Sequence, residues 1–490
     1  MTVDEYMKTI AILFFLSFSI PFTLQAQEPD SLPQGKLWSL KECIDYALAN
    51  NLNVKRSEYA VESSEIELRQ SNWNRLPSLN GSAAYGYSWG RGLDPVSNSF
   101  VSQEIKSSNL AANASLPLIN GLSIHNTIRQ NKKAYAASEF DLKDARNDVM
   151  LNVAGLFITV VFNKELVDNA QYQLASSQQQ LDRTRKQVEA GALAKSEELN
   201  LDAQVAQNEL TLVQQQNALV FSLLQLKQAL QIPAPEPFDI EIPDVNPEDL
   251  ILDQSSEEIF QIARGSMPDI RSAELRIESS AYAVKAARGN LYPRLNLVGS
   301  VNTNYSSSAA TQFHPDGTFS YSTVPIGSVN GEGGASVYAM QPNGVFRDSY
   351  GPRDQFSDNI YRVLSVQLII PIFNNFNSRA TVQRSIITNK RAEIDAIEIS
   401  NTLRQNVETA YNDAVAASKT YNAAMRQVSA REEAFRMMEQ RQQAGAANSF
   451  EFQVSQNDLF QAQTDLARAK YDLIFKQKVL DFYQGKTLDY

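Results

Sequence analysis

The sequence is poor in the residues from which most enzymes build active sites. Its 490 residues include a single cysteine, Cys43, and two isolated histidines, His125 and His314. One cysteine excludes an internal disulfide framework and any site in which several cysteines hold a metal. We find no glycine-rich phosphate loop and no nucleophile triad. The sequence therefore predicts no enzyme activity, no cofactor and no bound metal.

Positive charge is also scarce. The chain has 44 Lys and Arg against 55 Asp and Glu, which gives a formal net charge of −11. Nucleic-acid binding depends on cations that neutralise phosphates. The charge balance therefore predicts no nucleic-acid partner.

Long hydrophobic runs are confined to the N-terminus. An apolar run from Ile10 to Phe22 is followed by Gln25-Ala26-Gln27. It is too short to span a membrane and is typical of a secretory signal. We expect residues 1–26 to be a signal peptide and the protein to be exported. Signal peptides begin with positive charge, and Asp4 and Glu5 are unusual there. A start at Met7-Lys8 would fit this pattern better than a start at Met1. No later stretch approaches eighteen continuous apolar residues, so we expect no transmembrane helix.

Proline is absent from residues 118–232 and from every position after Pro371. From Leu403 to Met438, apolar or small residues recur at alternating steps of four and three, and an earlier stretch from Val149 to Leu181 does the same. This 3.5-residue period is typical of helices packed in a coiled-coil seam. The sequence predicts two helices, each about 100 Å long at roughly 1.5 Å per residue, which is too long for a globular core.

The chain is internally duplicated. Adding 216 to a residue number maps Pro77 onto Pro293, and adding 254 maps Gly191 onto Gly445. We expect repeats over 38–230 and 255–484, joined by a Pro-rich equatorial linker over 231–254. The two offsets differ by 38 residues, which predicts an insertion within 303–359. That segment lacks a helical period and is expected to be a long exposed loop.

After each mapped proline the hydrophobic period changes from helical to two. Segments 77–117 and 293–371 each predict a β-hairpin whose strands have one apolar and one small polar face. Such strands fit a membrane barrel with lipid outside and water inside, or a soluble two-faced hairpin. Tyr and Trp towards the strand ends favour the membrane.

The remaining segments, 38–76, 118–230, 255–292 and 372–484, are expected to be helical. In each half two shorter helices, 39–74 and 196–230 in the first, match one long helix when stacked end to end. Four strands per chain cannot close a barrel, because open edges would be unsatisfied in lipid. Two copies would give eight strands, whose barrel would be filled by side chains, and three copies would give twelve, enough for a lumen. The strand count alone favours three copies only weakly.

The order of these features resembles the TolC-like outer-membrane efflux proteins, the outer membrane factor family, over essentially all of the mature sequence. The resemblance rests on Leu40-Lys41-Glu42-Cys43-Ile44 and Ala47-Leu48 in the first helix, Pro77 and Pro293 before strands, Pro371-Ile372-Phe373-Asn374-Asn375 after the last strand, and the turns Ala190-Gly191-Ala192 and Ala444-Gly445-Ala446. It implies a mainly α fold, with a long α-helical coiled-coil barrel across the periplasm and a twelve-stranded barrel in outer-membrane lipid.

The resemblance also implies a function. A homotrimer would dock onto a periplasmic adaptor, or membrane fusion protein, that links it to an inner-membrane pump. The protein would be the passive outer-membrane channel of a tripartite efflux or type I secretion system. The alternative is a soluble periplasmic coiled-coil adaptor or structural protein, in which the hairpins would be ordinary soluble β-structure.

The two helical turns are the candidate sites of adaptor docking. Both glycines also cap helices, which they must do in either case. The docking candidates are Gly191, Ala192, Leu193, Gly445, Ala446 and Ala447.

In the family an acid six places after the second glycine helps to form the tunnel constriction, and here that residue is Glu451. A second family acid is replaced by Val454, and the first turn offers Glu197 and Glu198. A ring of carboxylates would favour cations. Alternatively, these acids only suit the dipole of a helix N-terminus after Ser196 and Ser449.

Overall fold

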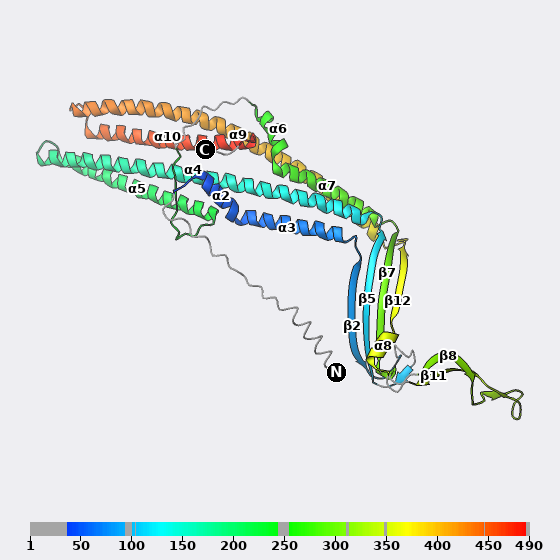
Figure 1. The fold of residues 1–490 in the computed structure, drawn as a ribbon. Coiled ribbons are helices and arrows are strands. Elements are labelled where there is room, and N and C mark those ends of the chain that lie inside the picture. The colour runs from blue at the N-terminus through cyan, green and yellow to red at the C-terminus, as the bar shows by residue number, and fades with distance from the viewer. Residues whose placement is uncertain are drawn as a thin grey trace.

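The structure, a computed structural model, describes residues 37–93, 100–102, 104–243, 254–309, 313–346, 350–444 and 446–486. The expected signal peptide over 1–26 and the glycine Gly445 lie outside the described residues. The chain forms an elongated bundle of helices with a sheet of long strands at one end (Figure 1). A narrow hairpin projects beyond the far end of that sheet.

The helices and strands follow the duplication. The first half contains β1 (Leu37–Trp38), α2 (Leu40–Asn50), α3 (Leu52–Trp73), β2 (Ser78–Ser88), β3 (Arg91–Leu93), β4 (Phe100–Ser102), β5 (Ile105–Ile119), α4 (Ser123–Glu189), α5 (Lys195–Leu230) and β6 (Asp239–Ile240). The second contains α6 (Ser256–Ser266), α7 (Pro268–Gly289), β7 (Arg294–Ser306), the 3-10 turn η1 (Ser307–Ala309), β8 (Phe313–Tyr321), β9 (Gly327–Ser328), β10 (Ser336–Val337), β11 (Met340–Phe346), α8 (Pro352–Asp358), β12 (Tyr361–Ile369), α9 (Asn377–Gln443) and α10 (Ser449–Tyr483). The long helices α4 and α9 have 67 residues each. The mainly helical fold with four long strands is confirmed.

The expectation of one continuous helix over 39–74 is wrong. The helix breaks at Asn51, which has extended backbone dihedrals and caps α3 by accepting the Asn53 amide at 2.8 Å. The corresponding residue of the second half is Met267, where α6 ends before Pro268. In the second half Pro268 marks the break, and this break is obvious in the sequence. In the first half an asparagine cap marks it, and that break is not obvious in the sequence.

The inserted segment is also more ordered than expected. It contains the hairpin β8–β11 and the short helix α8, which starts at Pro352. Buried Gln355 ties α8 to the sheet, because its side chain accepts the Ser306 amide at 2.9 Å and donates to the Ser306 carbonyl at 3.1 Å. A seven-residue helix is too short to show a clear period in the sequence.

The four long strands form one antiparallel sheet in the order β12-β7-β5-β2. Residues that pair across strands share a face, and the register places most apolar residues on one face and most polar residues on the other. Exceptions include Lys106, Ser108, Thr303 and Arg362 on the apolar face and Ile105, Val298, Tyr361 and Val363 on the polar face. The apolar face carries Leu79, Ala83, Tyr85, Tyr87, Leu110, Ala112, Ala114, Leu116, Leu295, Leu297, Val301, Tyr305, Leu364, Val366 and Leu368. The polar face carries Ser78, Asn80, Ser82, Asn109, Asn113, Ser115, Asn296, Ser300, Asn302, Asn304, Ser365 and Gln367.

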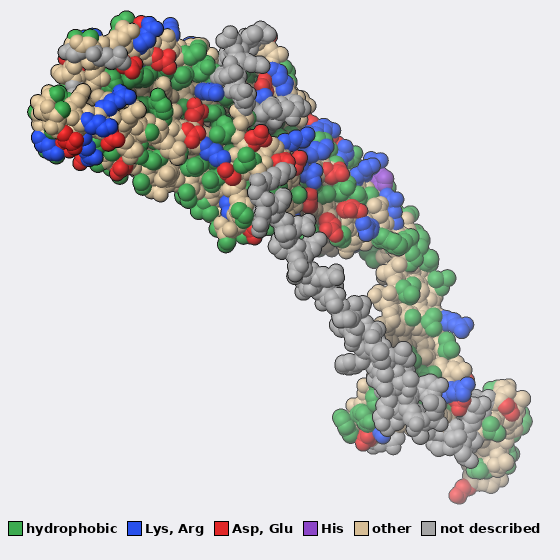
Figure 2. All heavy atoms as spheres, turned by 60° about the vertical axis from the view of Figure 1, so that its left-hand side comes forward, with side chains coloured by type: hydrophobic (Ala, Val, Ile, Leu, Met, Phe, Trp, Pro, Cys, Tyr) green, Lys and Arg blue, Asp and Glu red, His purple; other side chains and the backbone are tan. Residues whose placement is uncertain are grey.

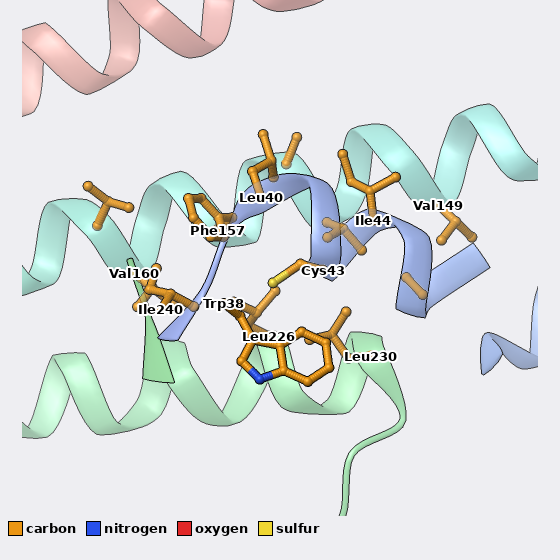
Figure 3. Packing of buried hydrophobic residues seen from close by; sticks show 14 of the residues in the cluster. Trp38, Leu40, Cys43, Ile44, Val149, Phe157, Val160, Leu226, Leu230 and Ile240 are labelled. Atoms are coloured by element: carbon orange, nitrogen blue, oxygen red, sulfur yellow. The ribbon is translucent and has the colours of Figure 1, made fainter. Parts of the chain in front are cut away.

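The main hydrophobic core lies midway along the helical bundle, where α2 packs between α4 and α5 (Figure 3). Cys43 lies at its centre beside Trp38, Leu226 and Leu230, and it is fully buried. Burial raises the pKa of the Cys43 thiol to about 12, because the thiolate would lose its hydration. Cys43 is thus a small buried packing residue.

Helix α4 contains an 18-residue window of mean hydropathy 1.5, apolar and long enough by composition alone to cross a membrane. The sequence, which has no eighteen continuous apolar residues beyond the N-terminus, does not predict such a helix. Of that window 44% is buried within the chain, and the buried residues of α4 include Val153, Phe157 and Val160 of the main core. Core helices meet the same criterion, so packing accounts for the composition.

Candidate channel wall and helical tips

The polar face of the sheet is an uncharged surface on which most side chains are small. Between residue 296 and the far ends of the strands it presents only uncharged residues, and Arg294 lies at the end next to the helices. The amide of Asn109 donates to the side-chain oxygen of Asn304 across the β5–β7 pair at 2.5 Å. Serine and asparagine side chains can hydrogen-bond water without a fixed charge, so this face suits the wall of a water-filled passage.

The opposite face suits lipid. Figure 2 shows that charged side chains crowd the helical part of the molecule, whereas few lie over the sheet. Near the outer end of β2, Tyr85 and Tyr87 pack edge to face with ring centroids 5.5 Å apart, and Tyr87 stacks on Trp89 at 6.1 Å. Aromatic rings with polar tips favour the boundary between lipid and water. The ladder they form is consistent with one rim of a membrane-spanning sheet.

The passage from sheet to helix is a tight turn in both halves. Gly121 and Leu122 take consecutive left-handed conformations with φ of 59° and 61° before α4 begins. Their counterparts Asn375 and Phe376 do the same before α9, with φ of 51° and 65°. A Cβ on Gly121 would lie 2.3 Å from the carbonyl oxygen of Gly289. The end of α7 thus lies so close to the start of α4 that residue 121 has no room for a side chain.

The helices α4 and α7 meet through a set of polar contacts. Asp141 of α4 accepts a hydrogen bond from Ser272 of α7 at 2.5 Å and pairs with Arg276 at 2.6 Å. Burial raises the pKa of nearby Asp144 to about 6, and the negative charges of Asp148 and Asp269 contribute in the same direction. At the junction between the two halves, α4 and α7 therefore approach closely and are joined by a specific ion pair.

The first helical turn, at the other end of α4, is a Schellman cap. Gly191 has φ of 76°, its amide donates to the Val188 carbonyl, and the Ala192 amide donates to the Gln187 carbonyl at 2.8 Å. No heavy atom would lie within 4 Å of a Cβ on Gly191. Its left-handed backbone therefore accounts for the glycine. Ala192 is exposed and Leu193 half-buried, which leaves their docking role a prediction.

The second turn keeps the same hydrogen bond although Gly445 itself is not described. The Ala446 amide donates to the Arg441 carbonyl at 2.7 Å, the counterpart of the bond from Ala192. Ala446 is exposed and Ala447 half-buried. Directly beyond the turn, Phe450 is 72% exposed in the first turn of α10. Phe450 is not among the residues predicted for docking, and its only signal in the sequence is a large apolar residue beside a helix start.

The acids of the first turn differ in their partners. Glu198 pairs with Lys195 at 2.6 Å and lies 3.6 Å from Arg185, and only 15% of its side chain is exposed. Glu197 is half-buried in the same turn. The cap of α5 is Ala194, with no side-chain cap bond. The helix expected over 196–230 therefore begins one residue earlier, at Lys195.

Glu451 is the more accessible acid. Its amide donates to the Asn448 side chain at 2.8 Å, so Asn448 caps α10, which begins at Ser449. The Glu451 carboxylate lies 3.8 Å from Arg441 and is 46% exposed. Val454, at the position of the second family acid, is also exposed. Glu451 can therefore present its charge beyond the chain, whereas Glu198 is neutralised within it.

Metal ligands do not gather near these acids. Within the described ranges the structure holds no group of three or more His, Cys, Asp or Glu side chains that could bind a metal ion. The candidate chemistry of the tips is therefore one of charge and surface contact.

Comparison with known proteins supplies a family. The family model described as outer membrane efflux protein matches residues 43–230 and 259–485. Outer membrane protein OprJ of Pseudomonas aeruginosa is 26% identical over 302 residues. That match covers 58% of this chain and 59% of the length of OprJ.

Solved structures show the same fold. CusC, whose structures concern transmembrane channel formation, superposes with a TM-score of 0.71 at 17% identity, covering 93% of this chain and 96% of CusC. The CmeC outer membrane channel of Campylobacter jejuni gives 0.68 at 16% identity over 92% of this chain and 87% of CmeC. The open-state MtrE outer membrane channel of Neisseria gonorrhoeae gives 0.68 at 17% identity over 92% and 89%.

Proposed function

Because this chain belongs to the outer membrane efflux protein family, we propose that three copies form a passive channel through the outer membrane. The observation that carries the proposal is the sheet β12-β7-β5-β2, which has an apolar face, a neutral polar face and two edges unpaired among the described residues. Unpaired edges are not tolerated in lipid. Three copies supply twelve strands, which close the sheet around a lumen lined by the polar face.

The helices would continue this passage into the periplasm, with the helical tips farthest from the membrane. There the channel would meet a periplasmic adaptor, which connects it to an inner-membrane pump. We assign this contact to the tip residues Gly191, Ala192, Leu193, Gly445, Ala446 and Ala447. The chain is then a non-enzymatic conduit for efflux or type I secretion, and selection of the cargo lies mainly in the pump.

Membrane fractionation tests the channel against a soluble periplasmic adaptor. The apolar face of the sheet leaves Leu79, Leu364 and Val366 largely exposed in one chain, and a lipid environment would cover them. We expect the protein to remain in the outer-membrane fraction after high-salt and carbonate washes, because burial of apolar surface does not weaken with salt. Release into the soluble fraction would refute the channel.

The accessible acid at the second turn would form a ring at the narrow end of the tunnel. In a threefold assembly Glu451 would place three carboxylates around the axis and favour cations. We expect Glu451→Gln to lower the cation-to-anion permeability ratio of single channels in planar bilayers.

Glu432→Gln is the matched control, since Glu432 is an exposed acid on α9 well before the turn. It should leave the permeability ratio unchanged. If Glu451→Gln also leaves it unchanged, Glu451 serves only the N-terminus of α10.

A further inference from the structure

The inserted segment of the second half carries a hairpin that stands apart from the main sheet. Within the described residues β8 pairs only with β11, and the pair β9–β10 continues the hairpin towards its tip. Figure 1 shows the hairpin leaving the outer end of the sheet and projecting sideways beyond β12. The two faces of the hairpin are therefore largely uncovered in the single chain.

One face of the hairpin is apolar. The register places Tyr321 opposite Met340 and Phe319 opposite Pro342, and alternate residues of a strand share a face. Tyr321 is 71% exposed, Phe319 61% and Met340 58%. Two aromatic rings and a thioether thus stay uncovered by the chain itself.

The other face is polar and forms its own hydrogen bonds. Ser320 lies opposite Gln341, and its hydroxyl donates to the side-chain oxygen of Asn343 at 2.6 Å. The side-chain amide of Asn343 donates in turn to the Thr318 hydroxyl at 2.9 Å. These bonds join the two strands across the polar face. That face can remain in water, whereas the apolar face gains free energy when it is covered.

The apolar surface continues to the tip and is almost free of charge. Val324, Ile326 and Val329 are between 52% and 67% exposed. From residue 313 to residue 346 the only charged side chains are Asp316 and Glu332, and there is no Lys or Arg. Exposed apolar residues gathered in this way mark an interaction surface. The scarcity of charge favours an apolar partner over one that is recognised by its charge.

The hairpin leaves the sheet where lipid would meet water. It follows β7 through the turn η1, at the end of the strands farthest from the helices. At that end Tyr87 stacks on Trp89, and the rings of Tyr305 and Phe356 have centroids 6.2 Å apart. Aromatic rings with polar tips prefer the boundary of a bilayer. The root of the hairpin therefore lies at the outer boundary of the proposed membrane.

We propose that the apolar face of the hairpin β8–β11 rests on the outer leaflet, at the boundary between lipid headgroups and acyl chains. This contact depends on the proposed membrane channel and lies outside its barrel. The nine residues of β8 reach about 30 Å at roughly 3.3 Å per residue, whereas the four long strands are together only about 14 Å wide. A straight hairpin of that length leaves the curved wall of a barrel and passes over the lipid beside it.

The same contact gives the hairpin a mechanical role. Lipid is the one apolar partner that the proposed function supplies on every side of the barrel. In a threefold assembly three hairpins would lie on the membrane around the barrel and oppose its tilting, because aromatic anchors at the interface help to set tilt.

Quenching of a fluorescent label by lipid tests the contact in the full chain. Tyr321→Cys and Met340→Cys place the dye NBD on the apolar face, and Gln341→Cys places it on the polar face. Cys43 stays in place because it is fully buried, and the wild type treated with the dye is the blank. The assembled protein is reconstituted in phosphatidylcholine vesicles. Part of the lipid carries a doxyl quencher, either near the headgroup or near the end of the acyl chain.

We expect the labels at Tyr321→Cys and Met340→Cys to emit at shorter wavelength than the label at Gln341→Cys. They should also lose severalfold more intensity to the doxyl lipid. The shallow quencher should act more strongly than the deep one, since the hairpin lies at the boundary. Met340 and Gln341 are adjacent, so the difference between their labels reports the face of the hairpin and not its distance from the barrel.

A label at Val301→Cys separates the hairpin contact from the channel itself. Val301 lies on the apolar face of the central strand β7 and is 45% exposed, so lipid should quench it in any membrane-spanning sheet. If this label is quenched and the hairpin labels are not, the hairpin contact alone is overturned. Short-wavelength emission would then indicate cover by another copy, and long-wavelength emission would indicate water. If Val301→Cys is not quenched either, the hairpin contact and the proposed channel fail together.

A polar version of the hairpin is the matched variant. Phe319→Ser combined with Met340→Ser removes apolar side chains from the contact and leaves the hydrogen bonds of the polar face intact. The label at Tyr321→Cys should then lose most of its quenching, while the label at Val301→Cys keeps it. Unchanged quenching at Tyr321→Cys would show that the apolar face does not hold the hairpin on the lipid.

Discussion

Replacing Leu110 by arginine is expected to keep the protein out of the membrane. Leu110 lies on the apolar face in the middle of β5, opposite Ala83 and Thr303, and is 40% exposed. If that face meets lipid, an arginine near the bilayer midplane costs about 2–4 kcal/mol in each copy. The fraction of protein retained in carbonate-washed membranes should fall sharply.

The adjacent residue provides the matched control. Ala111 points to the polar face, so Ala111→Arg would place its charge in the water-filled lumen. This variant should insert normally and change only the single-channel conductance. In a soluble two-faced hairpin both side chains would face solvent or a protein partner, and arginine at Leu110 would not decide the compartment. Equal membrane retention of the two variants would contradict a lipid-facing role for the apolar face.

The period of the sequence predicts the long elements well because each buries one continuous stripe or face. In α9, Leu403, Val407 and Ala414 are all buried, as their alternating spacing requires. The faces of the strands are predicted equally well, because the register pairs apolar Leu79 with Ala114 and polar Asn80 with Asn113. A face that alternates over ten residues leaves little choice of register.

The ends of the elements are much harder to predict. The helix breaks at Asn51, although the hydrophobic period of the sequence continues across this residue. Only the hydrogen bond of the Asn51 side chain to the next helix shows the break. Asn448 and Ser449 are both good N-caps, and the choice between them depends on which oxygen reaches the Glu451 amide. At Leu122 and Phe376 the chain takes left-handed conformations that the sequence disfavours for such residues. The close approach of neighbouring elements imposes these conformations, and no local pattern encodes it.

The candidate site residues divide in the same way. Gly191 could be placed at a helix cap from the sequence, because a left-handed cap strongly prefers glycine. The difference between Glu198 and Glu451 could not, since Arg185, which pairs with Asp202 at 3.2 Å and lies 3.6 Å from Glu198, is on another helix. Whether Glu451 lines a passage depends on how other copies of the chain pack around it.

The glycine at the junction of sheet and helix should be the least replaceable residue of the fold. Gly121→Ala combines a left-handed backbone, φ of 59°, with a Cβ 2.3 Å from the Gly289 carbonyl oxygen. The left-handed conformation alone costs roughly 1–2 kcal/mol, and the overlap with backbone atoms can be relieved only by separating α4 from α7. We expect a marked fall in the melting temperature followed by helical circular dichroism.

Two other glycines separate the two causes. Gly191→Ala has the left-handed backbone, φ of 76°, without any neighbour within 4 Å, and should loosen only the helical tip. Gly289→Ala has no unusual φ, but its Cβ would lie 2.7 Å from the Gly121 carbonyl oxygen. If the close approach matters most, Gly289→Ala should resemble Gly121→Ala, and Gly191→Ala should melt like the wild type. A Gly121→Ala variant as mild as Gly191→Ala would show that the turn yields, and that the two halves are not held together at this point.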